Sequence, residues 1–377
     1  MVKVLSIYWQ QRQVLLNLVR KNQPVSRASL RALSGIRLGT VGIIVDNLKT
    51  EGLLKECFKK TSPRGRYTGW LEINPSGRLV IGVELSQEKV SGVLTNLLGQ
   101  DLAEEEILLP VSADQEEIWK AIQETITRLM GISPEVPRAG LGFVDPGLVD
   151  FEKGISLYSS ILPVWKNVPV RKTLEETFHL PVILSNSEQA KAMAEYWFGQ
   201  AKGVDNFVFI EYGRGIACGI FSHGQIVRGS QAIAGELGHT RIIGEKKICR
   251  CGRPGCLEVL CCWPEIKNLI DKGKDKKIKK RLTYLAVSIA TLVNILNPAL
   301  VILDENFDWL GSERVQELMD RVKEEVFPEA KSRLKVTVSR LGSKIGARGA
   351  AAWVLENLFS TGFHLPAHSQ RDKKARR

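Results

Sequence analysis

Features of membrane and secreted proteins are missing from this sequence. Its 377 residues contain no apolar run that approaches the ~20 residues of a membrane span. The beginning, MVKVLSIYWQQRQ, lacks both an apolar signal-peptide core and a small-residue cleavage site. A composition of 44% hydrophobic and 25% charged residues is typical of a globular chain. We therefore expect a cytoplasmic protein of two or three domains, with no membrane partner.

Cysteine is scarce and unevenly distributed. The seven residues, an odd number, are mostly clustered, which favours reduced thiols or metal ligands over a disulfide framework. The stretch GELGHTRIIGEKKICRCGRPGCLE (235–258) has the spacing H-x9-C-x-C-x4-C, formed by His239, Cys249, Cys251 and Cys256. One nitrogen and three sulfurs suit structural zinc in tetrahedral coordination, and inert reduced cysteines are the alternative. Four protein ligands leave no open position, so we expect the metal to fix a loop and not to catalyse.

Acidic residues are scarce in the first fifth of the chain. Residues 1–75 contain 13 lysine and arginine residues against 4 aspartate and glutamate residues, which accounts for +9 of the net charge of +12. Such a concentration of positive charge indicates contact with nucleic acid, the alternative being a solvated basic face. Two later basic runs, 271–281 and 371–377, are interpreted as solvated surface and a frayed end.

The same segment has the pattern of a winged helix-turn-helix. A helix over 11–22 is expected to place four apolar side chains on its core face, namely Val14, Leu15, Leu18 and Val19. Ser26 can cap a second short helix, and the glycine-bearing turn SGI follows it. A third helix lies within RLGTVGIIVDNLKTEGLL (37–54), and its core face consists of Val41, Ile44, Val45 and Leu48. Two strands around a basic tip then form the wing.

This arrangement predicts binding to double-stranded DNA. The third helix would enter the major groove and the wing would contact the neighbouring backbone or minor groove. The expected contacts on the helix and just before it are Arg37, Thr40, Asn47 and Lys49, and those on the wing are Arg64 and Arg66. A helical module for protein contacts is the alternative.

The third helix has two weak points. Arg37 stands where a serine or threonine would cap it, and Gly42 inside it costs ~1 kcal/mol relative to alanine. Such a helix either orders fully only on DNA or brings its backbone unusually close to it. The sequence leaves both readings open.

From residue 78 the chain alternates between buried strands and helices. Two similar α/β halves follow each other, which predicts a duplicated fold with a ligand-binding cleft between the halves. The expected domains are a winged helix-turn-helix over 1–75, a first half over 76–190 and a second half with the zinc loop over 191–365. The basic tail, 366–377, is expected to be disordered.

Residues 10–360 resemble the ROK family, which comprises sugar kinases and sugar-responsive repressors. The motif Gly235-Glu236-Leu237-Gly238-His239, followed by the cysteine cluster, carries this resemblance most specifically. The segment SRASLRALSGIRLGTVGIIVDNLKTEGLL and the wing are similar to the repressor branch of xylose and N-acetylglucosamine type. The resemblance implies a ribonuclease-H-like, actin-type ATPase body after the winged helix-turn-helix. It also implies that the cluster binds zinc and that a sugar pocket contains Asn186, Glu236, His239 and Glu258.

The sequence departs from the kinases of this family at two places. Glu84, Ser86, Gln87 and Glu88 stand where the family has the aspartate, glycines and threonine of its phosphate turn. Ser187 replaces the catalytic carboxylate, because the family's Asn-Asp pair is Asn186-Ser187 here. Glu188, one residue further along a helix, is expected to point ~100° away. We therefore predict that the chain is not an enzyme.

The sequence as a whole predicts a sugar-responsive transcriptional regulator, a repressor by the family resemblance, that binds a pseudo-palindromic operator as a homodimer or higher oligomer. Ile161 and Leu162 stand where the family commonly has an asparagine, so one sugar contact is expected to be missing. The first alternative is an ATP-dependent sugar kinase with an accessory DNA-binding domain. The second is a ligand-independent DNA-binding protein with a vestigial pocket.

Overall fold

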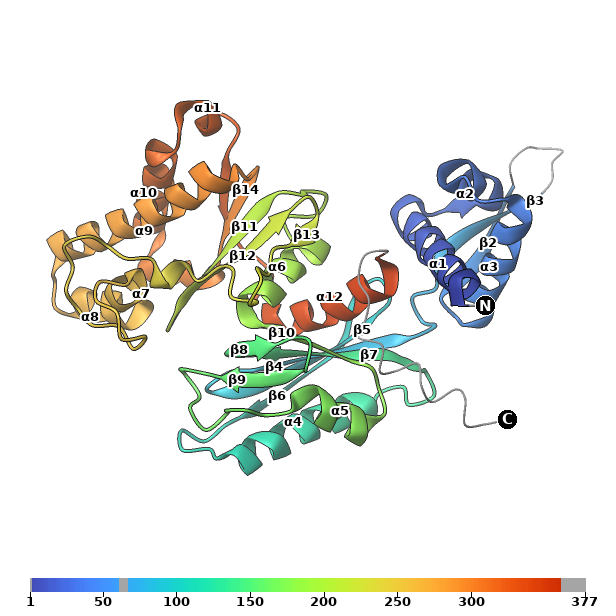
Figure 1. Cartoon of the computed structure of the whole chain (residues 1–377), viewed down its shortest axis with the longest axis horizontal. Coiled ribbons are helices and arrows are strands. Elements are labelled where there is room, and N and C mark those ends of the chain that lie inside the picture. The colour runs from blue at the N-terminus through green and yellow to red at the C-terminus, as the bar shows by residue number, and fades with distance from the viewer. Residues whose placement is uncertain (1, 61–66, 361–377) are drawn as a thin grey trace.

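The computed structural model describes residues 2–60 and 67–360 and contains an N-terminal domain and two α/β lobes (Figure 1). This arrangement confirms the predicted fold class. The expected wing tip, with Arg64 and Arg66, and the basic tail over 366–377 lie outside the described residues. Among the described residues, no single helix has the length and hydropathy of a membrane span, and only α2 and α3 reach that threshold when taken together, although they meet at 118°.

The N-terminal domain is a three-helix unit with a wing. Its elements are α1 (Val2–Asn22), β1 (Val25–Ser26), α2 (Arg27–Ser34), α3 (Leu38–Thr50), β2 (Leu54–Lys60) and β3 (Tyr67–Ile73). The strands form a sheet of order β1-β3-β2, in which β2 and β3 are the antiparallel strands of the wing. Ser26 caps α2 as predicted, since its hydroxyl accepts a hydrogen bond from the Ser29 N–H at 3.1 Å.

The first helix differs from its prediction. It begins at Val2, well before residue 11, and its fully buried side chains include Leu15, Leu16 and Val19, whereas Val14 and Leu18 are only half-buried. The helix contacts α2, α3 and the body helix α12 (Ile345–Phe359), so its buried surface is wider than one stripe. The predicted core face of α3 is confirmed, because all four of its side chains are fully buried.

The first lobe is a five-stranded sheet of order β10-β7-β4-β5-β6. Helices α4 (Gln115–Met130) and α5 (Val170–Phe178) cover one face, and α12 covers the other (Figure 1). The strands are β4 (Leu79–Leu85), β5 (Lys89–Asn96), β6 (Asp101–Leu108), β7 (Arg138–Asp145) and β10 (Val182–Asn186). A small hairpin is formed by β8 (Leu148–Asp150) and β9 (Ile155–Tyr158).

The second lobe repeats this plan with the sheet order β13-β12-β11-β14-β15. In both sheets a three-stranded antiparallel meander continues into parallel strands. The strands are β11 (Phe207–Tyr212), β12 (Ile216–Ser222), β13 (Gln225–Ile226), β14 (Leu300–Leu303) and β15 (Lys335–Val338). The helices are η1 (Leu237–His239), α7 (Leu257–Cys261), α8 (Trp263–Asp271), α9 (Asp275–Leu296), η2 (Glu305–Leu310), α10 (Ser312–Glu325) and α11 (Pro328–Lys331).

Two helices pass between the lobes and pack against each other. Helix α6 (Ser187–Phe198) follows β10 of the first lobe but lies on the second sheet, and α12 follows β15 of the second lobe but lies on the first sheet (Figure 1). Their backbones touch, because a Cβ added at Gly349 would lie 2.0 Å from the carbonyl oxygen of Ala190. Any side chain at Gly349 would separate the helices.

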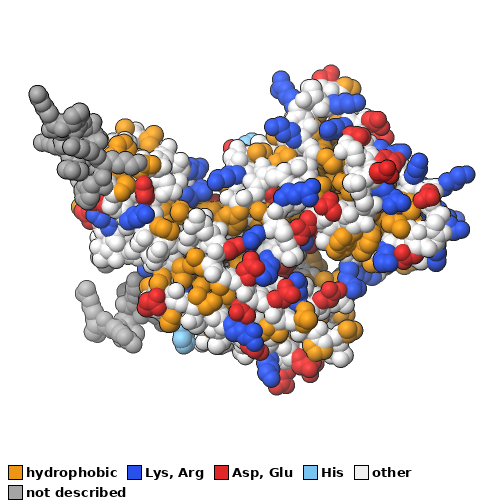
Figure 2. All heavy atoms as spheres, turned by 180° about the vertical axis from the view of Figure 1, so that it is seen from behind, with side chains coloured by type: hydrophobic (Ala, Val, Ile, Leu, Met, Phe, Trp, Pro, Cys, Tyr) orange, Lys and Arg blue, Asp and Glu red, His pale blue; other side chains and the backbone are white. Residues whose placement is uncertain are grey.

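The N-terminal domain rests on the ends of these two helices. The guanidinium of Arg20 in α1 lies 4.5 Å from the ring centroid of Trp197 in α6 and 5.9 Å from that of Phe359 in α12. One hydrophobic core extends from the buried side of α1 and α3 into α6 and α12. Elsewhere, Figure 2 shows acidic and basic side chains interspersed over one face of the body.

Candidate functional site

A cavity of about 710 Å³ lies between the two lobes. The loop after β4 and the β10–α6 junction line it from one side, and the β11–β12 turn, η1 and the start of α7 line it from the other. The four residues expected to bind sugar, Asn186, Glu236, His239 and Glu258, all line this cavity. A concave space with a few convergent polar groups is the usual form of a small-molecule site.

Asn186 presents an unused acceptor to this cavity. The residue ends β10 and is 5% exposed. Its side-chain amide donates to a carboxylate oxygen of Glu188 at 2.5 Å, whereas its Oδ1 has no hydrogen-bond partner among the described residues. A buried acceptor without a partner costs about 1–3 kcal/mol, and a ligand hydroxyl would remove this cost.

Glu188 corrects an expectation from the sequence. It was expected to point away from the site, yet its carboxyl lines the cavity because it bends back over the first turn of α6 to meet Asn186. Burial, and then the negative charges of Glu211 and Glu236, raise the pKa of Glu188 well above its usual value. The protonated form is therefore favoured, and it can donate a hydrogen bond.

The two predicted glutamates have different surroundings. Glu258, in the first turn of α7, is 8% exposed, and its carboxylate accepts two hydrogen bonds from the Arg250 guanidinium at 3.0 and 3.2 Å. Glu236 lies 3.8 Å from Nε2 of His239. Burial raises the pKa of Glu236, and the charge of His239 opposes this effect. Both carboxylates can accept hydrogen bonds from ligand hydroxyls.

A second polar group, at what we call the Lys191 end of the cavity, is an ion cluster that the sequence did not predict; Ser187, Lys191 and Glu211 of this cluster line the cavity. The Lys191 ammonium lies 2.8 Å from Glu211 and 2.9 Å from Asp304, and the Ser187 hydroxyl donates to Glu211 at 2.6 Å. Burial lowers the pKa of Lys191, but the surrounding carboxylates raise it well above its usual value. Glu84 lies nearby in β4, and burial raises its pKa to about 7. A usable signal existed, because Glu211 lies near the end of the buried strand β11 and Asp304 directly follows the buried strand β14, and the ends of such strands meet at ligand sites.

The predicted metal ligands come together as expected. One donor atom from each of His239, Cys249, Cys251 and Cys256 lies within 4.8 Å of all the others. The Cys251 and Cys256 sulfurs are 3.6 Å apart, and Nδ1 of His239 is 3.8 Å from the Cys249 sulfur. Tetrahedral zinc places such donors about 3.6–3.8 Å apart, so the donor set fits this ion. The cluster can hold a metal ion.

The metal cluster and the cavity share His239. Its Nδ1 faces the cysteines, while its Nε2 faces Glu236 on the cavity side. Gly255 permits the tight loop around the cluster, because a Cβ there would lie 2.6 Å from the carbonyl oxygen of Glu245 and its φ is +72°. Cys261 and Cys262, outside the motif, are buried in the protein core. A metal ion in the cluster would therefore orient a residue that lines the cavity.

The residues expected to contact DNA divide into two groups. Arg37 is exposed at the start of α3, its side chain makes no capping hydrogen bond, and Thr40 is half-buried one turn later. Farther along, the Asn47 amide donates to the Tyr8 hydroxyl at 2.8 Å and Lys49 forms an ion pair with Glu56 at 2.5 Å. The side chains of Asn47 and Lys49 therefore already interact with other residues of the N-terminal domain.

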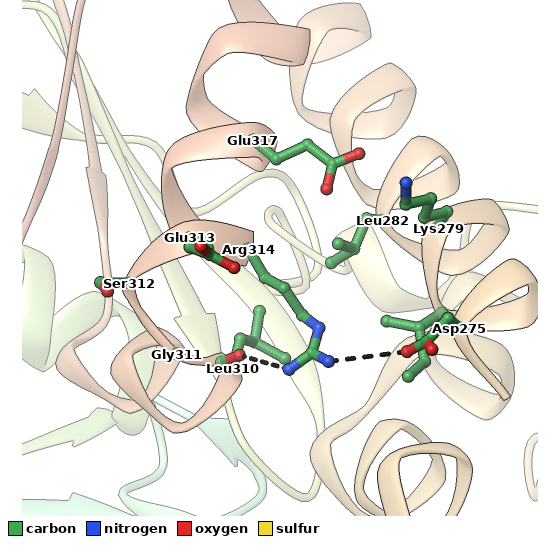
Figure 3. Close-up of a pocket in the computed structure, with 10 residues that line it drawn as sticks. Asp275, Lys279, Leu282, Leu310, Gly311, Ser312, Glu313, Arg314 and Glu317 are labelled. Carbon is green, nitrogen blue, oxygen red and sulfur yellow. Dashed lines mark hydrogen bonds and ion pairs between the residues drawn. The ribbon is translucent and has the colours of Figure 1, made fainter. Parts of the chain in front are cut away.

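A separate hollow of about 680 Å³ lies between α9 and the start of α10 (Figure 3). Arg314 extends across it, donating to the Leu310 carbonyl at 3.1 Å and lying 3.8 Å from Asp275. None of the residues expected to bind sugar, metal or DNA lines this hollow. Its central cation is already paired, so we assign it no role.

Comparison with known proteins places the site in a family. A model described as the ROK family matches residues 80–357. The chain is 26% identical to the xylose repressor of Caldicellulosiruptor bescii over 382 residues, covering 92% of this chain and 96% of the repressor. It is 28% identical to the glucokinase of Thermotoga maritima over 314 residues, covering 74% of this chain and 98% of the glucokinase.

A solved structure shows the same fold over nearly the whole chain. It is a ROK family transcriptional regulator described as a homologue of the Escherichia coli Mlc protein, and the TM-score is 0.82. The sequences are 24% identical, and the match covers 94% of this chain and 98% of the other. The fold shared with this regulator thus extends beyond the ROK region.

Proposed function

Since this chain belongs to the ROK family, we propose that it is a sugar-responsive DNA-binding repressor whose body binds a sugar without phosphorylating it. The observation that carries the proposal is a winged helix-turn-helix packed directly on helices that line or support the cavity between the lobes. The likeness to the xylose repressor over most of both chains supports it, whereas the likeness to the glucokinase covers a smaller part of this chain.

The polar groups of the cavity suit a neutral sugar. Oδ1 of Asn186 and the carboxylates of Glu236 and Glu258 accept hydrogen bonds, and the protonated Glu188 donates one. Sugar hydroxyls both donate and accept, so one ring can satisfy this mixed set. The cations Lys191, Arg214 and Arg250 also line this space, but each is already paired with a carboxylate, so an anionic ligand such as a sugar phosphate is disfavoured.

The Lys191 end of the cavity is unsuited to binding a nucleoside triphosphate. A kinase needs a cationic centre that is free to meet the phosphates, but Lys191 is already paired with Glu211 and Asp304. Ser187 donates its proton to Glu211 and offers no carboxylate base. Arg214, another cation that lines the cavity, is likewise already paired, with Glu88 at 3.2 Å. These features support a body that binds sugar and does not transfer phosphate.

The metal would be structural zinc bound by His239 and the three cysteines. When bound, zinc would hold the 239–256 loop in its folded form and fix the His239 ring through Nδ1. This chain's own residues would then do the binding, because Nε2 of His239 and the neighbouring Glu236 face the cavity. All four positions are taken by protein ligands, which supports a structural role.

Helix α6 connects the cavity with the DNA-binding domain. Glu188 and Lys191 in its first half line the cavity, and Trp197 in its last turn contacts Arg20 of α1. A twelve-residue helix spans about 18 Å, so a small rotation at one end reaches the other without any flexible link. Induction requires the sugar to bind the arrangement that cannot bind DNA more tightly than the one that can.

The expected assembly is a homodimer on a pseudo-palindromic operator, with two recognition helices about one helical turn apart. A gel shift with DNA from beside the gene, repeated with a panel of free sugars, tests the function. Release of the DNA by one sugar is expected. A coupled ATP assay with the same sugars tests the kinase alternative, for which Glu188 would have to act as the base. Sugar-dependent ATP turnover would refute the proposal.

A further inference from the structure

We propose that the first half of α3 recognises thymine in the operator through its 5-methyl group, with Leu38 and Ile43 as the contacting side chains. Gly39 and Gly42 are the positions at which the helix backbone comes close to the base edges. This inference rests on the proposed DNA-binding function and specifies which chemical feature of the DNA is recognised.

The outward face of α3 is apolar where it would enter the groove. Leu38 is 49% exposed and Ile43 is 63% exposed. Neither side chain is needed for the core, because four other side chains of the same helix are fully buried there. Leu38, Gly39 and Ile43 are exposed and Gly42 is half-buried, and the four lie within an arc of ~140° on the outer side of the first two turns, because each residue advances by ~100° around the axis. The N-terminal residues of a recognition helix are those that meet base edges.

The two glycines have no packing reason to be there. A Cβ added at Gly39 or at Gly42 would meet no atom within 4 Å among the described residues outside the helix's own backbone. Both residues have ordinary helical backbone angles, since neither has a positive φ. Each costs α3 ~1 kcal/mol in helix propensity relative to alanine. Glycine in a helix that gains nothing from it internally is typical of a backbone that a ligand approaches closely.

The chemistry of the DNA major groove indicates which base these apolar side chains would contact. Thymine is the one base whose major-groove edge carries a methyl group, and it is recognised by apolar side chains. Side chains able to hydrogen-bond with bases are few at this end of the face, where Arg37 and Thr40 lie at its border. No acidic residue occupies the first turn of α3, and the exposed Asp46 farther along is paired with Arg27 at 3.0 Å. The arrangement therefore favours thymine and flanking phosphates.

The principal experiment is a methyl-deletion scan with the full-length protein. Duplexes would be enriched from a random-sequence pool, and each thymine of the enriched site would then be replaced by uracil, which removes only the methyl group. At one or more positions we expect affinity to fall about fourfold, the effect of losing one buried carbon group. In the Ile43→Ala or Leu38→Ala variant, the same replacement should have no further effect.

A matched control is Ile295→Ala, which removes an isoleucine that is 72% exposed on α9 of the body. It should keep the full uracil effect. If uracil is tolerated at every position while the duplex still binds, this inference is wrong and the DNA-binding function stands. If the protein enriches no duplex at all, the DNA-binding function fails as well. If Ile43→Ala instead weakens self-association without DNA, measured by sedimentation, the apolar face is a protein interface and the inference is overturned.

The glycines provide an independent test with effects of opposite sign. Gly39→Ala and Gly42→Ala should each raise the thermal midpoint of the free protein, because alanine favours the helix and meets no neighbour. Each should also weaken operator binding at least about tenfold, because the added methyl group holds the helix away from the bases. Gly203→Ala, in a body turn with φ +79°, is the control that should lower the midpoint and leave affinity unchanged. Unchanged or tighter DNA binding by both helix variants would overturn the close approach.

Discussion

The two ends of the cavity between the lobes differ in how their polar groups are satisfied. At the Asn186 end, the buried Oδ1 has no partner among the described residues and Glu236 has only a histidine 3.8 Å away, although Glu258 is paired with Arg250 at 3.0 Å. At the Lys191 end, Glu211 and Asp304 are paired with the ammonium at 2.8 and 2.9 Å. Unpaired buried polar groups cost free energy that a ligand can recover, whereas a completed ion cluster offers a ligand little.

Removal of the metal should have the largest effect on sugar binding, because the metal supports His239 and the loop at the Asn186 end of the cavity. After chelation we expect sugar binding to fall at least ~100-fold, since metal binding and local folding of such a loop are coupled. Calorimetry with and without added zinc would measure this. Cys251→Ser should lose the metal, while Cys262→Ser, outside the cluster, should retain it. Metal content unchanged in Cys251→Ser would contradict the ligand assignment.

Lys191→Met tests the Lys191 end of the cavity, where the ion pairs are already formed. The change leaves the buried carboxylate of Asp304 and the half-buried carboxylate of Glu211 without a cation, so we expect a loss of about 3–5 kcal/mol in stability. The thermal midpoint would report it. Lys267→Met is the matched control, because its partner Asp271 is exposed and such pairs contribute about 0–1 kcal/mol. Equal shifts in the two variants would show that the buried cluster is not special.

Glu84→Gln tests the Lys191 end through the pH dependence of the protein's stability. Burial raises the pKa of Glu84 to about 7, so the folded protein holds a proton there that the unfolded chain releases near pH 4.5. Stability should therefore fall as the pH rises from about 4.5 to about 7, by up to about 3 kcal/mol. The glutamine variant lacks this loss and should be more stable than the wild type at pH 8. A constant difference between the two proteins across that range would refute the assignment.

Asn186→Ala should have the smallest effect of the four. Removing the unused acceptor should weaken sugar binding about tenfold, as expected for one or two hydrogen bonds. Gln87→Ala changes a residue that lines the cavity on its phosphate-turn side, and it should leave sugar affinity nearly unchanged. Calorimetry with the sugar found in the gel-shift panel measures both. Similar losses in the two variants would show that the two ends do not differ in ligand binding.

Local spacing predicted the parts of the site that lie close together in sequence. The ligands of the metal cluster fall within one short segment, the cap of α2 follows from the serine before it, and the buried face of α3 follows from a repeat of 3.6 residues. Lys191 and Asp304 are 113 residues apart, and sheet topology alone brings them together, so no spacing rule could pair them. Glu188 was misplaced because helical periodicity fixes the direction of the Cα–Cβ bond but not the course of a long side chain.

The contact between the DNA-binding domain and helices α6 and α12 suggests how the domains of such proteins can be exchanged. Helices α6 and α12, one leaving each lobe, both end beneath a single arginine, since Trp197 lies in the last turn of α6 and Phe359 is the last residue of α12. A movement of these helix ends would reach the DNA-binding domain through this aromatic contact and the hydrophobic core beside it. A chimaera joined between residues 74 and 78 therefore needs to preserve this aromatic contact and the hydrophobic core that α1 and α3 share with α6 and α12, so that a foreign sugar-binding body can control the same promoter.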